Sequence, residues 1–271
     1  MNSVQANEAR VALVGPSLVD PPACALCKGP ARAGSRYCWC CNKVCCALRV
    51  NPGSMPLVVP VHLFAPGDHW NVMLRRYKDA PAIAARQYFT GLLVSELELF
   101  LAAHGGCVRA ATGGFEACCV VPSSRPASRA TSPHPLESVL AGVGALSGLD
   151  VVRLASVEPT HHLRPSIGAF VPPDPKAVSN RRVLLFDDSW VTGARALSAV
   201  VALRSAGAKV AGVLVLGRAV DPSASSFSRW WWAASRGPRS AVVGGTATTS
   251  CSDLCVVACG RPILPATSGP H

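Results

Sequence analysis

The chain has 271 residues, of which 49% are hydrophobic, and it carries a formal net charge of +11 at pH 7. This length and apolar content allow one large domain with a substantial core, or one domain with an appendage. No run of about 18 uncharged apolar residues occurs, and the first 20 residues lack the charged-then-apolar layout of an export signal. We therefore expect a cytoplasmic protein with no membrane partner.

The positive charge is carried by 21 Arg and only 5 Lys. Arg is the better bidentate partner of phosphate groups. The charge therefore fits a polyphosphate substrate or nucleic acid, and charge alone does not separate these two classes of partner.

Composition divides the chain into five segments. We expect a disordered leader at 1–20, a small zinc-ribbon-like module at 21–50, a Pro- and Gly-rich linker at 51–80, an α/β domain at 81–220 and a tail of uncertain order at 221–271.

Seven of the thirteen cysteines lie between Cys24 and Cys46, in a chain without an export signal, so metal binding is favoured over disulfides. Two Cys-x2-Cys pairs separated by ten residues suit one tetrahedral zinc of four thiolates, each pair presented by a tight turn. A site closed by four thiolates leaves no open position, so we expect a structural zinc. The ligands are Cys24, Cys27, Cys38 and Cys41, although Cys40, Cys45 or Cys46 could substitute within the second pair.

Short apolar strands then alternate with helical patterns, which is typical of a parallel sheet with helices on both faces. The predicted elements are a helix at 82–104, a strand at 118–121, a helix at 136–146, a strand at 151–155, a long irregular loop at 157–180, a strand beginning at Val183, its following helix, and a strand at 210–216.

The most informative segment follows Val183, where an apolar strand ends in Asp187 and Asp188 and leads into a short loop and a helix. Ligands of open parallel sheets bind beyond the carboxyl ends of the strands. The two carboxylates can accept hydrogen bonds from a vicinal diol. The loop from Ser189 through Trp190, Val191, Thr192 and Gly193 to Ala194 has a hydroxyl, a glycine and a helix N-terminus, which together form a phosphate cradle. Diol and phosphate side by side describe a ribose 5-phosphate.

This segment resembles the phosphoribosyl-diphosphate (PRPP) motif of type I phosphoribosyltransferases: an apolar strand, two acids and a Thr-Gly loop. The chain departs from the motif at Val191, where many members carry a second hydroxyl residue. The amino-terminal cysteine pairs, the Tyr77-Lys78-Asp79 segment, the Val-Pro loop near residue 121 and the Leu216-Gly217-Arg218 sequence resemble the actinobacterial branch of the ComF family. The resemblance covers roughly residues 24–220.

The resemblance implies a type I phosphoribosyltransferase fold, PRPP as substrate and Mg²⁺ as its companion ion. Asp187 and Asp188 would be the catalytic acids that hold the ribose hydroxyls, and residues 189–194 would hold the 5-phosphate. The loop after the first core strand, with Ser123, Ser124 and Arg125, would hold the pyrophosphate. Arg129 and His134 lie within the same connection, and Lys78 is a further candidate for phosphate contact. The reaction would be displacement of pyrophosphate by a nitrogen acceptor that the sequence does not name.

Two other functions compete with this one. ComF relatives are associated with DNA uptake, so a competence protein that binds single-stranded DNA or a DNA-processing protein is one alternative. A regulator that senses PRPP without turnover is the other. The roles of Cys40, Cys45, Cys46 and of Cys251, Cys255 and Cys259 in the tail stay open.

Overall fold

The computed structural model describes residues 23–123, 134–157 and 164–235. The predicted leader and most of the predicted tail, including Cys251, Cys255 and Cys259, lie outside the described residues. Five parallel strands form the central sheet in the order β1-β7-β6-β2-β3. They are β1 (Leu57–Phe64), β7 (Lys209–Ala219), β6 (Arg182–Trp190), β2 (Ala117–Val120) and β3 (Asp150–Val152).

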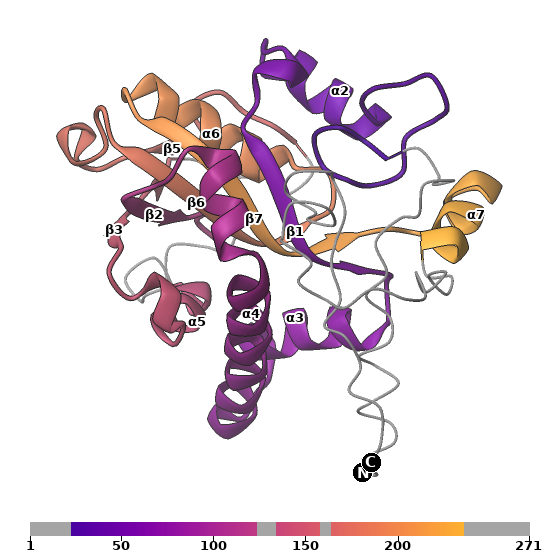
Figure 1. Cartoon of the computed structure of the whole chain (residues 1–271), viewed down its shortest axis with the longest axis horizontal. Helices are drawn as coiled ribbons and strands as arrows, with labels where there is room; N and C mark the ends of the chain where they lie inside the picture. Colours follow the sequence, from indigo (N-terminus) through magenta and orange to yellow (C-terminus); the bar gives the residue numbers. More distant parts are fainter. Residues whose placement is uncertain (1–22, 124–133, 158–163, 236–271) are drawn as a thin grey trace, which may run out of the picture.

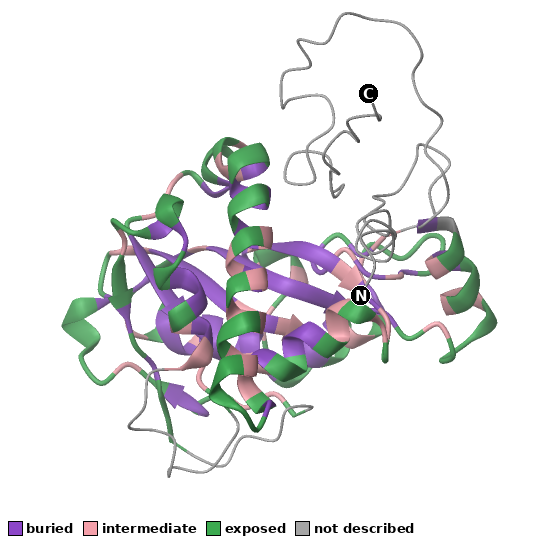
Figure 2. Ribbon diagram, turned by 90° about the horizontal axis from the view of Figure 1, so that it is seen from below, coloured by how far each residue is buried: buried purple, intermediate pink, exposed green. Residues whose placement is uncertain are grey.

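Helices cover both faces of this sheet (Figure 1). One face packs against α6 (Ala194–Ser205) and the cysteine module with α2 (Trp39–Ala47). The other packs against α3 (His69–Asp79), α4 (Ile83–Thr112) and α5 (Pro135–Ala141). Figure 2 shows the buried strands enclosed between helices whose outer sides are exposed. The expected α/β architecture with a parallel sheet is therefore confirmed.

The shorter elements lie in the connections and near the described carboxyl end. They are the 3-10 helices η1 (Pro52–Ser54), η3 (Gly144–Leu146) and η4 (Pro175–Ala177), the two-stranded antiparallel pair β4 (Ala155–Ser156) and β5 (Phe170–Val171), and the helix α7 (Ser226–Ser235).

Residues 51–80 are not a linker, as the sequence led us to expect, because they contain β1 and α3. Proline is tolerated in an edge strand, where a missing N–H donor faces no partner. Pro60 therefore fits in β1, which lies at the edge of the sheet beside β7. Asp68 caps α3 by accepting the backbone N–H of Asn71 at 2.8 Å. The prolines and glycines of this segment concealed one of the apolar strands of the core.

Further predictions differ in extent. The predicted helix at 82–104 continues to Thr112 as α4, and the predicted strand at 151–155 is β3 followed by β4. The predicted helix at 136–146 is α5 followed by η3, and Gly142 is the C-cap of α5. Strand β6 does not end at the first acid but continues through Trp190, which pairs with Arg218 of β7. Asp187 and Asp188 therefore belong to the strand itself.

Among the described residues, α4 is the one helix long and apolar enough to cross a membrane by length and composition. This is weak evidence for a span, because core helices pass the same test. Leu93, Leu97 and Phe100 bury one side of α4 in the cluster that also holds residues of the sheet and of α3.

Candidate functional site

The acidic pair lies at a topological switch point of the sheet. From β2 the chain passes through α5 to β3 on one side, whereas from β6 it passes through α6 to β7 on the other. Neighbouring parallel strands whose connections leave in opposite directions open a crevice at their carboxyl ends, where ligands of such sheets bind. β2 and β6 are such neighbours, and Asp187 and Asp188 stand at the carboxyl end of β6.

Asp188 is buried and already bound by three side chains. Its Oδ2 accepts the Tyr77 hydroxyl at 2.9 Å and pairs with Lys78, and its Oδ1 accepts the Ser189 hydroxyl at 2.9 Å. Burial alone would raise the pKa of Asp188, but the charge and hydrogen bond of Lys78 outweigh it and lower that pKa. Asp188 is therefore a fixed carboxylate that joins α3 to the end of β6.

Asp187 is in a different state. Its Oδ1 accepts the backbone N–H of Asp188 at 2.9 Å, which leaves Oδ2 as the acceptor for a ligand. Burial, together with the adjacent charge of Asp188, raises the pKa of Asp187 to about 7. Asp187 is therefore the member of the pair that can take up or release a proton near neutral pH.

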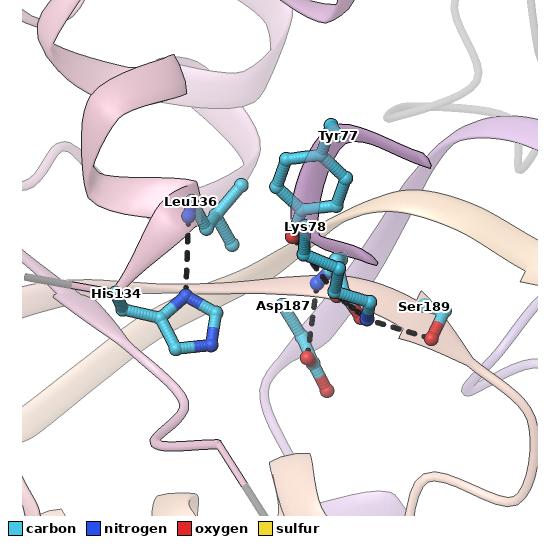
Figure 3. A network of polar contacts seen from close by, with 7 residues as sticks. Tyr77, Lys78, His134, Leu136, Asp187 and Ser189 are labelled. Atoms are coloured by element: carbon cyan, nitrogen blue, oxygen red, sulfur yellow. Dashed lines mark hydrogen bonds and ion pairs between the residues drawn. The ribbon is translucent and has the colours of Figure 1, made fainter. Parts of the chain in front are cut away.

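Three cationic or titratable side chains from different elements surround the acids. Lys78 comes from α3, His134 precedes α5 and Arg195 lies in the first turn of α6. Figure 3 shows His134, Asp187 and Lys78 gathered at this end of β6. Arg195 lies close enough for its charge to act on both acids, and its guanidinium carbon is 5.4 Å from the centre of the Phe170 ring. The site thus combines acids for hydroxyl groups with cations for an anionic group.

The loop after β6 ends at a helix N-terminus without a side-chain cap. Gly193 is the N-cap of α6, with a φ of 81°, and no side chain bonds to the first amides from that position. Thr192 Oγ1 accepts the Ala194 N–H at 3.3 Å. Amides of a first helical turn have no partner within the helix and attract anions. Beside Gly193, the buried Trp190 Nε1 has no acceptor among the described residues. The amides of the first turn of α6 are therefore the donors suited to a phosphate, because Trp190 itself is buried.

The structure brings together only part of the residues predicted for the site. Asp187, Asp188 and residues 189–194 form one continuous end of β6 and start of α6. Val191 is half exposed on that loop. Ser123 is exposed two residues after Val121, but Ser124 and Arg125 lie outside the described residues, so the predicted pyrophosphate loop stays a prediction.

Two residues of the site were not foreseen. Tyr77 was named only as part of the Tyr77-Lys78-Asp79 segment at the end of the predicted linker, and its contact with Asp188 spans 111 positions. Arg195 was overlooked although it directly follows the glycine loop. Its place in the first turn of a helix that starts at a candidate anion site was the available signal.

The four predicted metal ligands come together in the amino-terminal module. Their sulfur atoms lie within 4.8 Å of one another, all four residues are buried, and Cys27 Sγ is 3.7 Å from Cys38 Sγ. Four thiolates at about 2.3 Å from a zinc ion would be about 3.8 Å apart. The cluster therefore fits a tetrahedral metal ion. Among the described residues, Cys40, Cys45 and Cys46 are not part of the cluster.

The two cysteine pairs are presented differently. Cys24 and Cys27 belong to a tight turn in which the Lys28 N–H reaches the Cys24 carbonyl and Lys28 has a φ of 59°. Cys38 is the N-cap of α2 and Cys41 lies in its first turn, so the second pair is not a second turn of the same kind. A helix N-terminus favours thiolates, because its amides point at the sulfurs. The Cys41 N–H lies 3.5 Å from Cys38 Sγ in this way.

Comparison with known proteins does not assign the chain to a family. The sequence matches no model of a known protein family, and it matches no curated protein. The fold and the two clusters of side chains therefore carry the functional argument.

Proposed function

We propose that this chain is a ComF-like protein with a type I phosphoribosyltransferase fold, which transfers the 5-phosphoribosyl group of PRPP to a nitrogen acceptor. The observation that carries the proposal is the position of Asp187 near Arg195 in the first turn of α6, at the switch point of the sheet. An acid that accepts hydroxyl groups and an anion site a few residues away match the two ends of a ribose 5-phosphate.

In the proposed reaction the bond from the anomeric carbon to the pyrophosphate oxygen breaks, and a bond to the acceptor nitrogen forms. The acceptor nitrogen releases its proton to water, and pyrophosphate leaves with the electron pair of the broken bond. Asp187 would hold the ribose hydroxyls, and Lys78 and Arg195 would offset the charge of the phosphate groups. Burial lowers the pKa of His134 and its Nδ1 accepts the Leu136 N–H, so His134 would contact a phosphate as a neutral donor through Nε2. The protein would act by positioning and charge stabilisation rather than by covalent catalysis.

Two metal ions belong to the proposal. Mg²⁺ would neutralise the diphosphate, and Asp187 supplies the kind of oxygen ligand that this ion prefers. Zinc would be held by the four cysteines as a structural ion, because four thiolates leave no position for substrate. A cytoplasmic location, where PRPP is made and thiols stay reduced, is part of the same proposal.

The experiment is an assay of pyrophosphate release from PRPP and Mg²⁺ with purine, pyrimidine and amine acceptors. Asp187→Asn should bind PRPP about 10- to 150-fold more weakly, because a charge-assisted hydrogen bond is worth roughly 1.5–3 kcal/mol and a tenfold change is about 1.4 kcal/mol. Asp150→Asn is the matched control. Asp150 pairs with Arg181 at the amino end of β3, and most of its side chain is exposed.

The outcomes separate the candidate functions. Turnover that Asp187→Asn loses and Asp150→Asn keeps supports the transferase. PRPP binding without turnover for any acceptor points to a PRPP-sensing regulator. Equal PRPP affinity in wild type and Asp187→Asn refutes the proposed site.

One observation favours single-stranded DNA as a second candidate ligand. Trp39 at the start of α2 is 71% exposed, and Lys43 Nζ lies 4.7 Å from the centre of its ring. An exposed indole beside a cation can stack on a base while the cation meets the backbone. Binding of an oligonucleotide that weakens with salt and with Trp39→Ala, combined with no PRPP binding, would favour this function.

A further inference from the structure

The buried side chain of Arg218, at the end of β7, lies between the cysteine cluster and the candidate ligand loop. Its Nε donates to Cys27 Sγ at 3.4 Å. Its Nη1 donates to the carbonyl of Trp190 at 3.2 Å and also to that of Ala219. Gly29 leaves the space for it, since a Cβ there would be 2.5 Å from Arg218 Nη2. One guanidinium therefore touches both the metal module and the end of β6.

The charge of Arg218 has a physical reason to be at this position. Four thiolates around one divalent ion carry a net charge of −2, which is costly to bury without a cation nearby. Arg218 is 5% exposed and in contact with the cluster. Without the thiolates, a buried guanidinium would keep only the carbonyl oxygens as partners.

The contact continues beyond Arg218 into the loop. The Trp190 ring is 1% exposed and packs against Gly193, where a Cβ would lie 2.5 Å from Trp190 Cε2. Gly193 is the N-cap of α6 and accepts the Leu197 N–H at 2.9 Å. The sequence of contacts thus runs from the Cys27 sulfur through Arg218 and Trp190 to the first turn of α6.

We propose that Arg218 is a positioning residue that couples metal occupancy of the four-cysteine cluster to the shape of the loop Trp190–Ala194. With metal bound, the thiolates hold the guanidinium, and the guanidinium holds the Trp190 carbonyl at the mouth of the anion site. Without metal, Arg218 loses one of its anchors and the loop loosens. The role in ligand binding rests on the proposed function, whereas the coupling itself does not.

The test is amide hydrogen exchange of the full-length zinc-loaded protein, followed in peptides that span Ser189 to Leu197. Removal of zinc by a chelator should speed exchange in these peptides about tenfold or more, the scale of losing one buried charge-assisted contact. Peptides of α5, on the opposite face of the sheet, should change little. Arg218→Gln should give the same faster exchange with zinc still bound, which metal analysis of the same sample checks.

Two further variants separate the effects of charge and shape. Arg218→Lys keeps the positive charge, but a lysine lacks the planar guanidinium that contacts both the Cys27 sulfur and the Trp190 carbonyl. Amide hydrogens from Ser189 to Leu197 should therefore also exchange faster in this variant. Lys28→Asn is the matched control. Lys28 is a cation beside the same thiolates, and its Nζ donates to the Ala25 carbonyl instead of reaching β6. The Lys28→Asn variant should therefore show the same amide exchange in the loop as wild type.

Unchanged exchange of the loop on zinc removal, or in both zinc-loaded Arg218 variants, would overturn the proposal. If both Arg218 variants lose zinc, wild type with and without zinc decides the coupling: faster loop exchange without zinc supports it, and unchanged exchange overturns it. Binding of ribose 5-phosphate, measured by calorimetry, should weaken whenever the loop loosens. If the wild type binds no ribose 5-phosphate at all, the proposed function fails while the exchange experiment still decides the coupling.

Discussion

At the scale of single residues, the acidic pair is divided into two chemical states. Lys78, Tyr77 and Ser189 hold Asp188 as a carboxylate, while burial raises the pKa of its neighbour Asp187 to about 7. Pairs of titratable groups whose surroundings push their pKa values apart are typical of sites that do chemistry. The division assigns Asp188 to support and Asp187 to contact with a ligand.

The raised pKa of Asp187 makes a prediction about stability and pH. A carboxyl whose pKa rises from 3.8 to about 7 on folding binds more protons in the folded state between those values, so the free energy of unfolding falls as pH rises through that window. At about 1.4 kcal/mol per pH unit, a pKa change from 3.8 to about 7 corresponds to about 4 kcal/mol in the free energy of unfolding. Because Asp187 is partly exposed, we expect a smaller change in that free energy, roughly 1–2 kcal/mol. Asp187→Asn should therefore be more stable than wild type by that amount at pH 8 and equally stable below pH 4.

Urea unfolding of both proteins at pH 4, 6 and 8 measures this difference. Asp188→Asn serves as the contrast. Because the pKa of Asp188 is lowered, its carboxylate stabilises the fold above pH 4, so this variant should be less stable than wild type at pH 8. A variant Asp187→Asn that is destabilised at pH 8 would contradict the assignment.

At the scale of elements, the unit that makes the site is β6, the loop and α6. β6 lies between β2 and β7 and pairs with β2 as far as Phe186, whereas its carboxyl end from Asp187 to Trp190 is held by pairing with β7. Gly193 then turns the chain into α6 with a φ of 81°, a conformation that costs other residues roughly 1 kcal/mol or more. Small residues of α6, including Ala196 and Ala199, are buried and let the helix approach the sheet closely.

Gly193→Ala should test this unit. An alanine at this position would be strained by the positive φ, and its Cβ would also clash with the Trp190 ring. We therefore expect a loss of about 2–4 kcal/mol in the free energy of unfolding. Gly106→Ala is the control, because Gly106 is exposed within α4 and a Cβ there meets nothing within 4 Å. It should stabilise the protein by about 0.5–1 kcal/mol. Denaturant unfolding compares the two, and a neutral Gly193→Ala would show that the loop adapts.

At the scale of the whole molecule, the sequence predicted the repeating part of the fold and missed what depends on distant contacts. The apolar runs at 118–121 and 210–216 indicated buried strands, and they are strands in the structure. The strand at 57–64 was missed because Pro60 and the prolines around it were given more weight than its valines.

The candidate site shows the same limit. The sequence placed Asp187 and Asp188 at the end of a strand, and the four cysteines in one cluster, because both patterns are local. Tyr77 and Arg218 act through partners 111 and 191 positions away, on Asp188 and Cys27. No local pattern shows such contacts, since they arise only when the sheet order brings α3 and β7 beside the site.

The cysteine module is joined to the rest of the molecule by a continuous core. Cys24, Cys27 and Leu48 share one buried cluster with Leu197 and Val200 of α6. Outside this cluster, Arg204 of α6 also donates to the carbonyl of Ser54 at 2.8 Å. A module that shares its core with the sheet should not unfold separately from it.

The last prediction follows from this shared core. Purified protein should contain about one zinc per chain, as a closed four-thiolate site implies. Because an ion that binds only the folded state stabilises it by mass action, chelation should lower Tm by about 10 °C or more for a chain of this size. The loss should appear in a single transition, since the thiolates, Arg218 and α6 lie in contact. Calorimetry with and without chelator, with Cys46→Ser as a control at an exposed cysteine outside the cluster, makes the measurement. Two separate transitions, of which only a small one responds to chelator, would instead show that the module folds by itself and that the core seen between it and α6 contributes little to its stability.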